Sequence, residues 1–148
     1  MRGAVAFDAK LVGIYSGGAW LAERLAAELH GEHPTGFIDV SFYRDDYAKK
    51  GLRAKVETTS LPFEVEGSRI VLIDDVLYTG RSVRAAINEL YDYGRPDAIE
   101  LAVLIDRGGR ELPIEPTYVG ERVAVARGLT VVLDRRDDGR FELSLEPA

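Results

Sequence analysis

The chain has 148 residues, of which 46% are hydrophobic and 30% are charged, and this profile predicts one globular domain with a single core over residues 1–148. With 19 basic and 25 acidic side chains the formal net charge is −6, which argues against broad, unspecific nucleic-acid binding. The absence of cysteine excludes disulfides, zinc-thiolate sites and thiol nucleophiles. No apolar run approaches the ~20 residues that span a bilayer, and no secretory signal opens the chain, so we expect a cytoplasmic protein without a membrane partner.

The first part of the chain is predicted to form a strand, a glycine turn and a helix. Lys10–Tyr15 is a short apolar segment typical of a strand, and Ser16-Gly17-Gly18 follows it. Apolar side chains then recur at helical spacing up to Gly31, which suits the position just after a helix. Gly36–Tyr43 alternates enough to predict a second strand.

Between residues 44 and 61 neither the helical nor the strand period holds. This segment carries a basic island at Lys49–Lys55, followed by two threonines and a serine. We interpret it as a long loop, and loops of this length in compact domains are often active-site lids. A solvated connection without a function is the alternative.

The middle of the chain predicts a βαβ unit. Ile70–Ile73 is a continuous apolar run, as in a parallel strand that is covered on both faces. Val83–Tyr91 repeats apolar residues on one helical face before Gly94, which suits the end of a helix. Ala98–Ile105 is the next apolar strand and completes the unit.

The last part of the chain is predicted to form short β-strands. Tyr118–Val119 and Val123–Val125 are β-like pieces that follow an irregular, proline-containing segment. Asp138-Gly139 is a favoured turn dipeptide, and it predicts a hairpin between Thr130–Leu133 and Phe141–Leu145. Neither repeats nor low-complexity segments interrupt the sequence.

Two adjacent carboxylates, Asp74 and Asp75, follow the apolar run Ile70–Ile73, at the strand end where open α/β sheets bind ligands. Thr79–Ser82 then precedes the predicted helix, where unpaired backbone N–H groups and the helix dipole favour an anion such as a monophosphate. Carboxylates beside a phosphate site accept hydrogen bonds from a diol, so the pattern predicts a site for a ribose 5-phosphate. An acidic turn without a function is the alternative, which the fixed offsets of these residues disfavour.

Residues 70–82, IVLIDDVLYTGRS, resemble the phosphoribosyl diphosphate (PRPP) signature of type I phosphoribosyltransferases. FYRDDYAKK, DDVLYTGRSVRAAINELYDYGRP and LAVLIDRGGRELP extend the resemblance, over most of residues 11–120, to the PyrR family of pyrimidine operon regulators with uracil phosphoribosyltransferase activity. The resemblance implies an α/β, type I phosphoribosyltransferase-like fold: a central, mainly parallel sheet flanked by helices, with a small β-rich hood at about residues 107–127. It also implies a homo-oligomer, a dimer or larger.

The resemblance assigns roles to the positions that match the motifs of the family. Asp74 and Asp75 become the catalytic pair, which holds the ribose hydroxyls. The other expected PRPP-binding residues are Val76, Leu77, Tyr78, Thr79, Gly80, Arg81 and Ser82. The expected pyrophosphate-binding residues are Ser16, Gly17, Gly18 and Arg44, with a flexible lid over about residues 44–61. The expected uracil-binding residues are Asp106 and Arg107.

The reaction implied by the resemblance joins uracil to the ribose of PRPP. Uracil N1 attacks C1 of PRPP and displaces pyrophosphate, which gives UMP. Mg²⁺ is the implied cofactor, and it is bound mainly through PRPP rather than by a dedicated set of protein ligands. One departure from the family lies in the pyrophosphate loop, where members often carry an arginine and this chain has Gly17.

The same residues allow three alternatives to this enzyme. The first is an RNA-binding or nucleotide-sensing attenuation regulator with little catalytic activity, and the acidic net charge does not favour its RNA partner, since only Lys49–Lys55 gathers basic residues. The second is a purine or orotate phosphoribosyltransferase, which shares the PRPP loop and differs in the block LIDRGGRELP. The third, a nucleoside triphosphate hydrolase, lacks the required G-x-x-x-x-G-K-[ST] loop.

Overall fold

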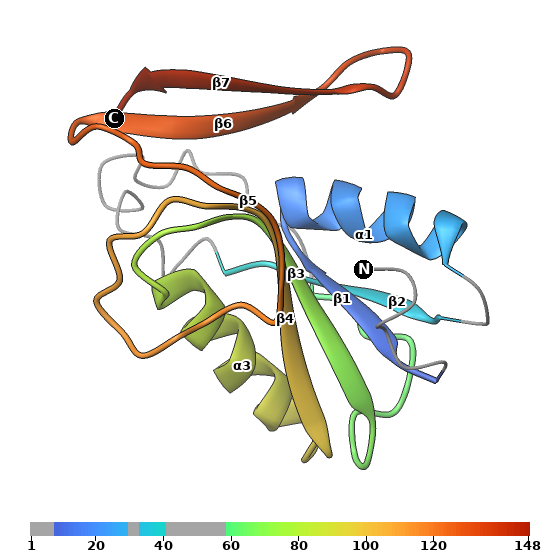
Figure 1. Ribbon diagram of the computed structural model, residues 1–148. Coiled ribbons are helices and arrows are strands. Elements are labelled where there is room, and N and C mark those ends of the chain that lie inside the picture. The colour runs from blue at the N-terminus through green and yellow to red at the C-terminus, as the bar shows by residue number, and fades with distance from the viewer. Residues whose placement is uncertain (1–7, 30–32, 41–58) are drawn as a thin grey trace.

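The computed structural model describes residues 8–29, 33–40 and 59–148. Its main sheet has five strands in the order β2-β1-β3-β4-β5, and each neighbouring pair is parallel. The strands are β1 (Lys10–Ile14), β2 (Thr35–Ile38), β3 (Arg69–Leu77), β4 (Ala98–Asp106) and β5 (Tyr118–Arg122). The helices α1 (Gly17–Glu28) and α3 (Arg81–Tyr93) lie on opposite faces of this sheet (Figure 1). The predicted α/β architecture with a mainly parallel sheet is confirmed.

The strand β3 is buried on both faces, as its continuous apolar run predicted. Ile70 and Leu72 pack in the cluster that includes α3, whereas Val71 and Ile73 pack in the cluster that includes α1. None of these side chains is more than 3% exposed. Full burial of such a side chain contributes about 1.5–3 kcal/mol, so the strand that leads to the acid pair is firmly held.

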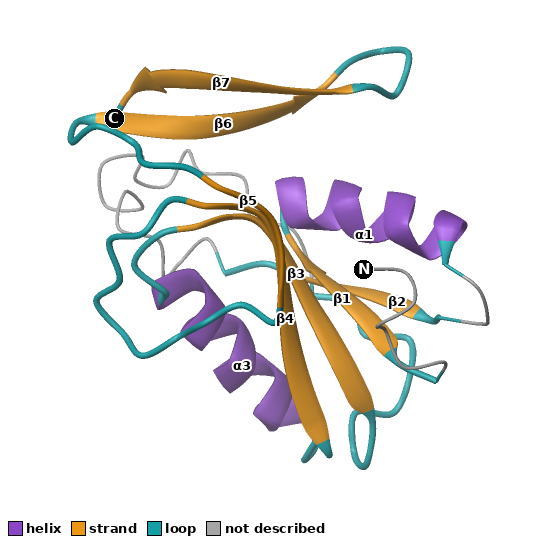
Figure 2. Ribbon diagram, in the orientation of Figure 1, coloured by secondary structure: helices purple, strands orange, loops and turns teal. Residues whose placement is uncertain are grey.

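A second, antiparallel sheet is formed by the hairpin of β6 (Leu129–Arg135) and β7 (Phe141–Pro147). Its turn contains Gly139 at φ +88°, a conformation that side chains rarely adopt, which confirms the predicted Asp138-Gly139 turn. The hairpin lies across the end of the main sheet at which β3 and β4 end (Figure 2). It supplies a small β-rich hood, although the range predicted for the hood, 107–127, contains β5 and the irregular chain before and after it.

Several strands differ from their predicted boundaries. β2 ends at Ile38, so Asp39 and Val40, which the predicted strand Gly36–Tyr43 contains, lie beyond the strand. β3 continues past the predicted end at Ile73 to Leu77, because β4 pairs with it over this whole stretch. The two acids therefore belong to the strand itself. The predicted strand Val123–Val125 is wrong: β5 ends at Arg122, opposite Asp106, the last residue of β4. Beyond it the N–H of Val123 still donates to the carbonyl oxygen of Asp106, and the pairing of the described strands β4 and β5 stops there.

Some sequence predictions fall outside the described residues. These are the end of the predicted strand Gly36–Tyr43, most of the predicted lid at 44–61 and the basic island Lys49–Lys55. Among the residues that are described, no helix is long and apolar enough to cross a membrane.

Candidate active site

The acid pair is fixed by the main chain at the carboxyl end of β3. Asp74 is 4% exposed and Asp75 is half-buried. The backbone N–H of Asp75 donates to Oδ1 of Asp74 at 2.8 Å, and the N–H of Val76 donates to Oδ1 of Asp75 at 2.8 Å. Each carboxylate thus has one oxygen held by a backbone donor, which restrains its orientation.

The first turn of α1 lies directly against this acid pair. A Cβ atom on Gly17 would collide with the carboxylate of Asp75, and one on Gly18 would collide with the carbonyl oxygen of Ile73. Ser16 stands at the N-cap position of α1 and is exposed. The structure therefore brings the predicted pyrophosphate loop, Ser16 to Gly18, next to the predicted ribose-binding acids, because Gly17 and Gly18 have no side chains that would hold α1 away from β3.

The predicted phosphate loop ends at the amino terminus of α3. Gly80 is the N-cap residue, with φ +95°, and as a glycine it has no side chain that could cap the helix. Thr79 accepts a hydrogen bond from the N–H of Arg81 through Oγ1 at 3.2 Å. A Cβ on Gly80 would also press on Ile114, which gives a second reason for glycine at this position.

The loop after β4 is built around a buried ion pair. Arg110 donates from Nη1 and Nη2 to the two carboxylate oxygens of Asp106, both at 2.8 Å, and Asp106 is 6% exposed. The hydrogen bonds from Arg110 hold the pKa of Asp106 below the ordinary aspartate range, although burial by itself would raise this pKa. Arg110 also donates to the carbonyl oxygens of Ile114 at 2.7 Å and of Tyr78 at 3.3 Å.

Arg107 connects the phosphate loop with the hairpin. Its guanidinium lies 3.9 Å from the centre of the Tyr78 ring, and its Nη1 donates to the carbonyl oxygen of Leu129 at 2.9 Å. Its backbone N–H donates to the carbonyl oxygen of Leu77 at 3.1 Å. Both residues predicted for uracil, Asp106 and Arg107, are thus near the site, and each is engaged by protein groups.

A hollow of about 200 Å³ opens between the acid pair and the hairpin. It is lined by Asp74, Asp75, Val76, Tyr78, Ser82, Arg107, Thr130 and Val131. Thr130 and Val131, on β6, were not predicted as site residues. No local pattern marks them, because they meet the acid pair only through the fold.

Among the described strands β6 pairs with β7 alone, so its main chain presents an open edge on the side of Arg107. The N–H of Ala148 donates to the carbonyl oxygen of Gly128, and the register then alternates, so Leu129 and Val131 turn their N–H and C=O groups away from β7. The carbonyl oxygen of Leu129 accepts the hydrogen bond from Arg107. Val131, two residues further along the same edge, lines the hollow. A flat ligand with an adjacent donor and acceptor would pair with such an edge.

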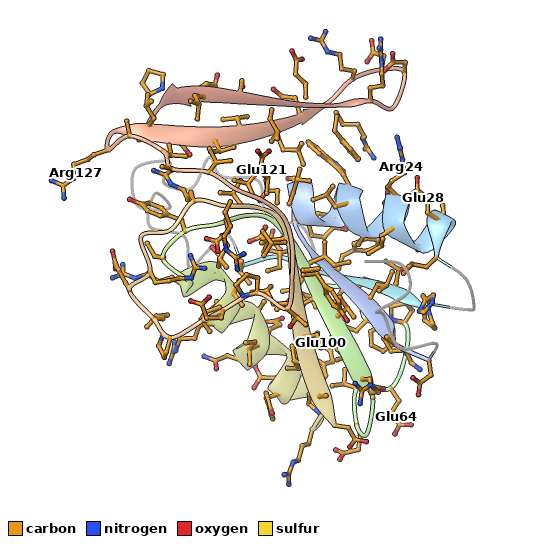
Figure 3. The ribbon with its side chains drawn as sticks, viewed as in Figure 1. Arg24, Glu28, Glu64, Glu100, Glu121 and Arg127 are labelled. Atoms are coloured by element: carbon orange, nitrogen blue, oxygen red, sulfur yellow. The ribbon has the colours of Figure 1, made fainter. Side chains whose placement is uncertain are left out.

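The other predicted residues lie as follows. The side chain of Leu77 belongs to the core, at 1% exposure, and Arg81 pairs with Glu111 at the surface. Arg44 lies outside the described residues. Two side chains that were not predicted for the site lie away from it: Arg127, just before β6, points outward from the molecule, and Glu64 lies at the far end from the hairpin (Figure 3).

The phosphoribosyl transferase domain family matches residues 8–126. The chain belongs to this family. Bifunctional protein PyrR from Ralstonia nicotianae is 57% identical over 150 residues, which cover 99% of this chain and 86% of the relative. Bifunctional protein PyrR from Pseudomonas aeruginosa is 50% identical over 124 residues, which cover 84% of this chain and 73% of the relative. The chain is thus a PyrR-type phosphoribosyltransferase.

Solved structures with the same fold are more distant in sequence. A hypoxanthine-guanine phosphoribosyltransferase from Bacillus anthracis superimposes with a TM-score of 0.65 at 17% identity, over 82% of this chain and 71% of that one. A hypoxanthine phosphoribosyltransferase from Staphylococcus aureus gives a TM-score of 0.65 at 21% identity, over 86% of this chain and 68% of that one. The fold is therefore that of the type I phosphoribosyltransferases.

A methyl group at position 17 should disturb catalysis through Asp75. In Gly17→Ala we expect the carboxylate of Asp75 to move aside while the fold survives, and kcat/KM to fall about 10- to 100-fold. Steady-state kinetics of Gly17→Ala, Asp75→Ala and the double variant measure this as a cycle. If the effect passes through Asp75, the double variant is no worse than Asp75→Ala; multiplicative losses contradict the explanation.

The ion pair of Asp106 should make stability depend on acid pH. Because its folded-state pKa is lowered, Asp106 stabilises the fold above about pH 4, and this contribution is lost as the pH falls through the folded-state pKa. We expect Asp106→Asn to lower the free energy of unfolding by about 3 kcal/mol at pH 7 and to flatten its decline in acid. Urea titrations from pH 3 to 7 measure both.

The matched control is Asp138→Asn, which removes the acid of an exposed pair with Arg140. Surface pairs of this kind contribute little, so Asp138→Asn should behave like the wild type at neutral pH. Equal losses in the free energy of unfolding for the two variants would show that the buried Asp106–Arg110 pair stabilises the fold no more than an exposed pair does.

Proposed function

We propose that this phosphoribosyltransferase acts in the cytoplasm and forms UMP and pyrophosphate from uracil and PRPP. The observation that carries the proposal is the hollow in which the acid pair, the start of α3 and the open edge of β6 meet. The name of the relatives, bifunctional protein PyrR, supports it, since the sequence blocks of this chain resemble that family. The homo-oligomer that the resemblance implies belongs to the same proposal.

Three features of the site hold the donor: the start of α3, the acid pair and the first turn of α1. The 5-phosphate is bound at the start of α3, beside Thr79 and Ser82, where N–H groups and the helix dipole attract an anion. The ribose hydroxyls donate to Asp74 and Asp75. The pyrophosphate then lies near the exposed Ser16 at the start of α1, because the carboxylate of Asp75 occupies the space beside Gly17.

The acid pair also serves the reaction itself. As the bond from C1 to pyrophosphate breaks, positive charge develops on the ribose ring, and the fixed negative charge of Asp74 and Asp75 stabilises it. Uracil N1 forms the new bond to C1, its proton is released, and pyrophosphate leaves with the electron pair of the broken bond. No covalent intermediate with a side chain is required, because positioning of the two reactants supplies much of the acceleration.

The residues present suit a Mg²⁺ ion that is held mainly by the substrate. Among the residues that the structure describes, no three His, Cys, Asp or Glu side chains gather as metal ligands. The two carboxylates beside the proposed ribose supply hard oxygen atoms of the kind that Mg²⁺ prefers, with the remaining ligands coming from substrate oxygens and water. Bound Mg²⁺ would neutralise the charge of the leaving pyrophosphate.

The base is assigned to the edge of β6. Uracil carries an N3–H beside a carbonyl group, and the C=O and N–H of Val131 form the complementary acceptor and donor on the open edge. This pairing directs N1 of uracil away from β6 and toward the acid pair on the other side of the hollow. Asp106, whose oxygens are engaged by Arg110, then supports the site from outside.

The purified protein should convert uracil and PRPP to UMP in the presence of Mg²⁺. In a competition assay with uracil, orotate, hypoxanthine and guanine, we expect uracil to be the preferred base. Asp74→Asn and Asp75→Asn should each lower kcat/KM about 100-fold, because each removes charge from beside the ribose. Chromatographic quantification of UMP and pyrophosphate measures these effects.

Asp97→Asn is the control, since Asp97 is exposed and precedes β4 at the opposite end of the sheet. It should turn over uracil like the wild type. Absence of UMP above background with the wild type would contradict the enzymatic proposal, and unchanged kinetics of the Asp74 and Asp75 variants would remove these residues from the site.

A second, regulatory role in pyrimidine gene expression is supported by the word bifunctional in the name of the relatives. The basic island Lys49–Lys55, which lies outside the described residues, is the only gathering of cations in the sequence that suits RNA. Salt-dependent retention of a pyrimidine-operon leader RNA is expected if this role is present. Failure to bind that RNA at low salt would contradict the regulatory role and would leave the enzymatic function unaffected.

A further inference from the structure

Arginines tie the hairpin of β6 and β7 to the rest of the molecule at both ends, and Arg135 of β6 adds an exposed ion pair with Glu23 of α1 at 3.4 Å. At the start of β6, Arg107 donates to the carbonyl oxygen of Leu129 at 2.9 Å and stacks on Tyr78. At the turn, Arg24 of α1 donates to the carbonyl oxygen of Gly139 at 3.1 Å and lies 5.4 Å from the ring centre of Phe141. Both anchors combine one hydrogen bond to the main chain with one aromatic contact, so they are chemically matched.

Only the anchor at Arg107 lies at the candidate site. Thr130 and Val131 follow Leu129 directly and line the hollow, whereas the turn at Gly139 is remote from its lining residues. The other partner of Arg107, Tyr78, belongs to the phosphate loop and lines the same hollow. One guanidinium therefore fixes the distance between the loop that carries the donor and the strand edge that faces the base.

The surroundings of Arg107 hold its side chain in this place although one buried donor atom is left without a hydrogen bond within the described part of the chain. Its Nε atom is buried and has no hydrogen-bond partner among the described residues. A buried donor without an acceptor is unfavourable, and such groups persist where the surrounding structure holds them for another purpose. The backbone bond from Arg107 to Leu77, the last residue of β3, keeps the base of the side chain aligned with the acid pair.

We infer that Arg107 is a positioning residue, which sets the place of the β6 edge above the acid pair through Leu129 and Tyr78. The positioning role rests on the proposed function in one respect, namely that the β6 edge binds the base. In this inference Arg107 acts through Leu129 and Tyr78, whereas the sequence resemblance implies that it contacts uracil directly. Loss of Arg107 should therefore loosen the start of β6 before any ligand is present, and it should weaken the base site more than the donor site.

The test compares Arg107→Met with Arg24→Met. In the ligand-free protein, hydrogen exchange of the peptide covering residues 128–134 should speed up about 10-fold in Arg107→Met, since a hydrogen bond from a charged group is lost. Kinetics of Arg107→Met should show KM for uracil raised about 10-fold, with KM for PRPP and kcat changed less than about 2-fold. Arg107→Lys, which keeps a cation beside Tyr78, should lie between the wild type and Arg107→Met.

Arg24→Met should speed exchange at residues 136–141 and leave KM for uracil unchanged. The inference is overturned if Arg107→Met leaves exchange of 128–134 unchanged, or if it lowers kcat without raising KM for uracil, as a group in contact with the reacting atoms would. An equal rise of KM in Arg24→Met would also overturn it, because general attachment of the hairpin would then set the site. The exchange experiment needs no turnover, so it decides the positioning role even if UMP is not formed.

Discussion

The buried pair between Asp106 and Arg110 is the interaction on which the site depends. The N-cap residue of α3, Gly80, has no side chain to cap the helix, and it gives the turn before α3 little stiffness of its own. The loop after β4 supplies the missing support: Arg110 reaches the carbonyl oxygen of Tyr78, and two backbone N–H groups that follow it donate to the carbonyl oxygen of Thr79. Because Asp106 fixes Arg110 from a buried position, the loop after β4 adds support to residues 78–80, which are otherwise held by the bond from the N–H of Arg81 to Thr79.

The sequence predicted those parts of the molecule whose signals are local. The apolar run Ile70–Ile73, the helical face of α3 and the dipeptide at residues 138–139 each depend on neighbours in the chain, and all were confirmed. The strand predicted at Val123–Val125 was wrong because strand pairing there depends on where β4 ends. Thr130 and Val131 were not predicted as site residues for a related reason, because they reach the acid pair only through the position of the hairpin across the end of the sheet.

The contact between Gly17 and Asp75 joins the two halves of the site without a side chain between them. α1 and β3 approach each other so closely here that there is no room for a Cβ on Gly17. An arginine, which the family often has at this position, would need the acid to lie elsewhere. The start of α1 is therefore arranged around the carboxylate of Asp75.

The proposed placement of the base on the open edge of β6 has a consequence for how selectivity for a base would be inherited. A donor and an acceptor that belong to the main chain are the same for every amino acid except proline, so a point mutation of Val131 to any other residue would leave the hydrogen-bonding pattern in place. A change of preferred base would have to arise by shifting the strand, through its register with β7 or its attachment to the sheet. Recognition through the main chain would tolerate changes of side chains in the hairpin. The position of the hairpin relative to the acid pair would then determine which base is bound.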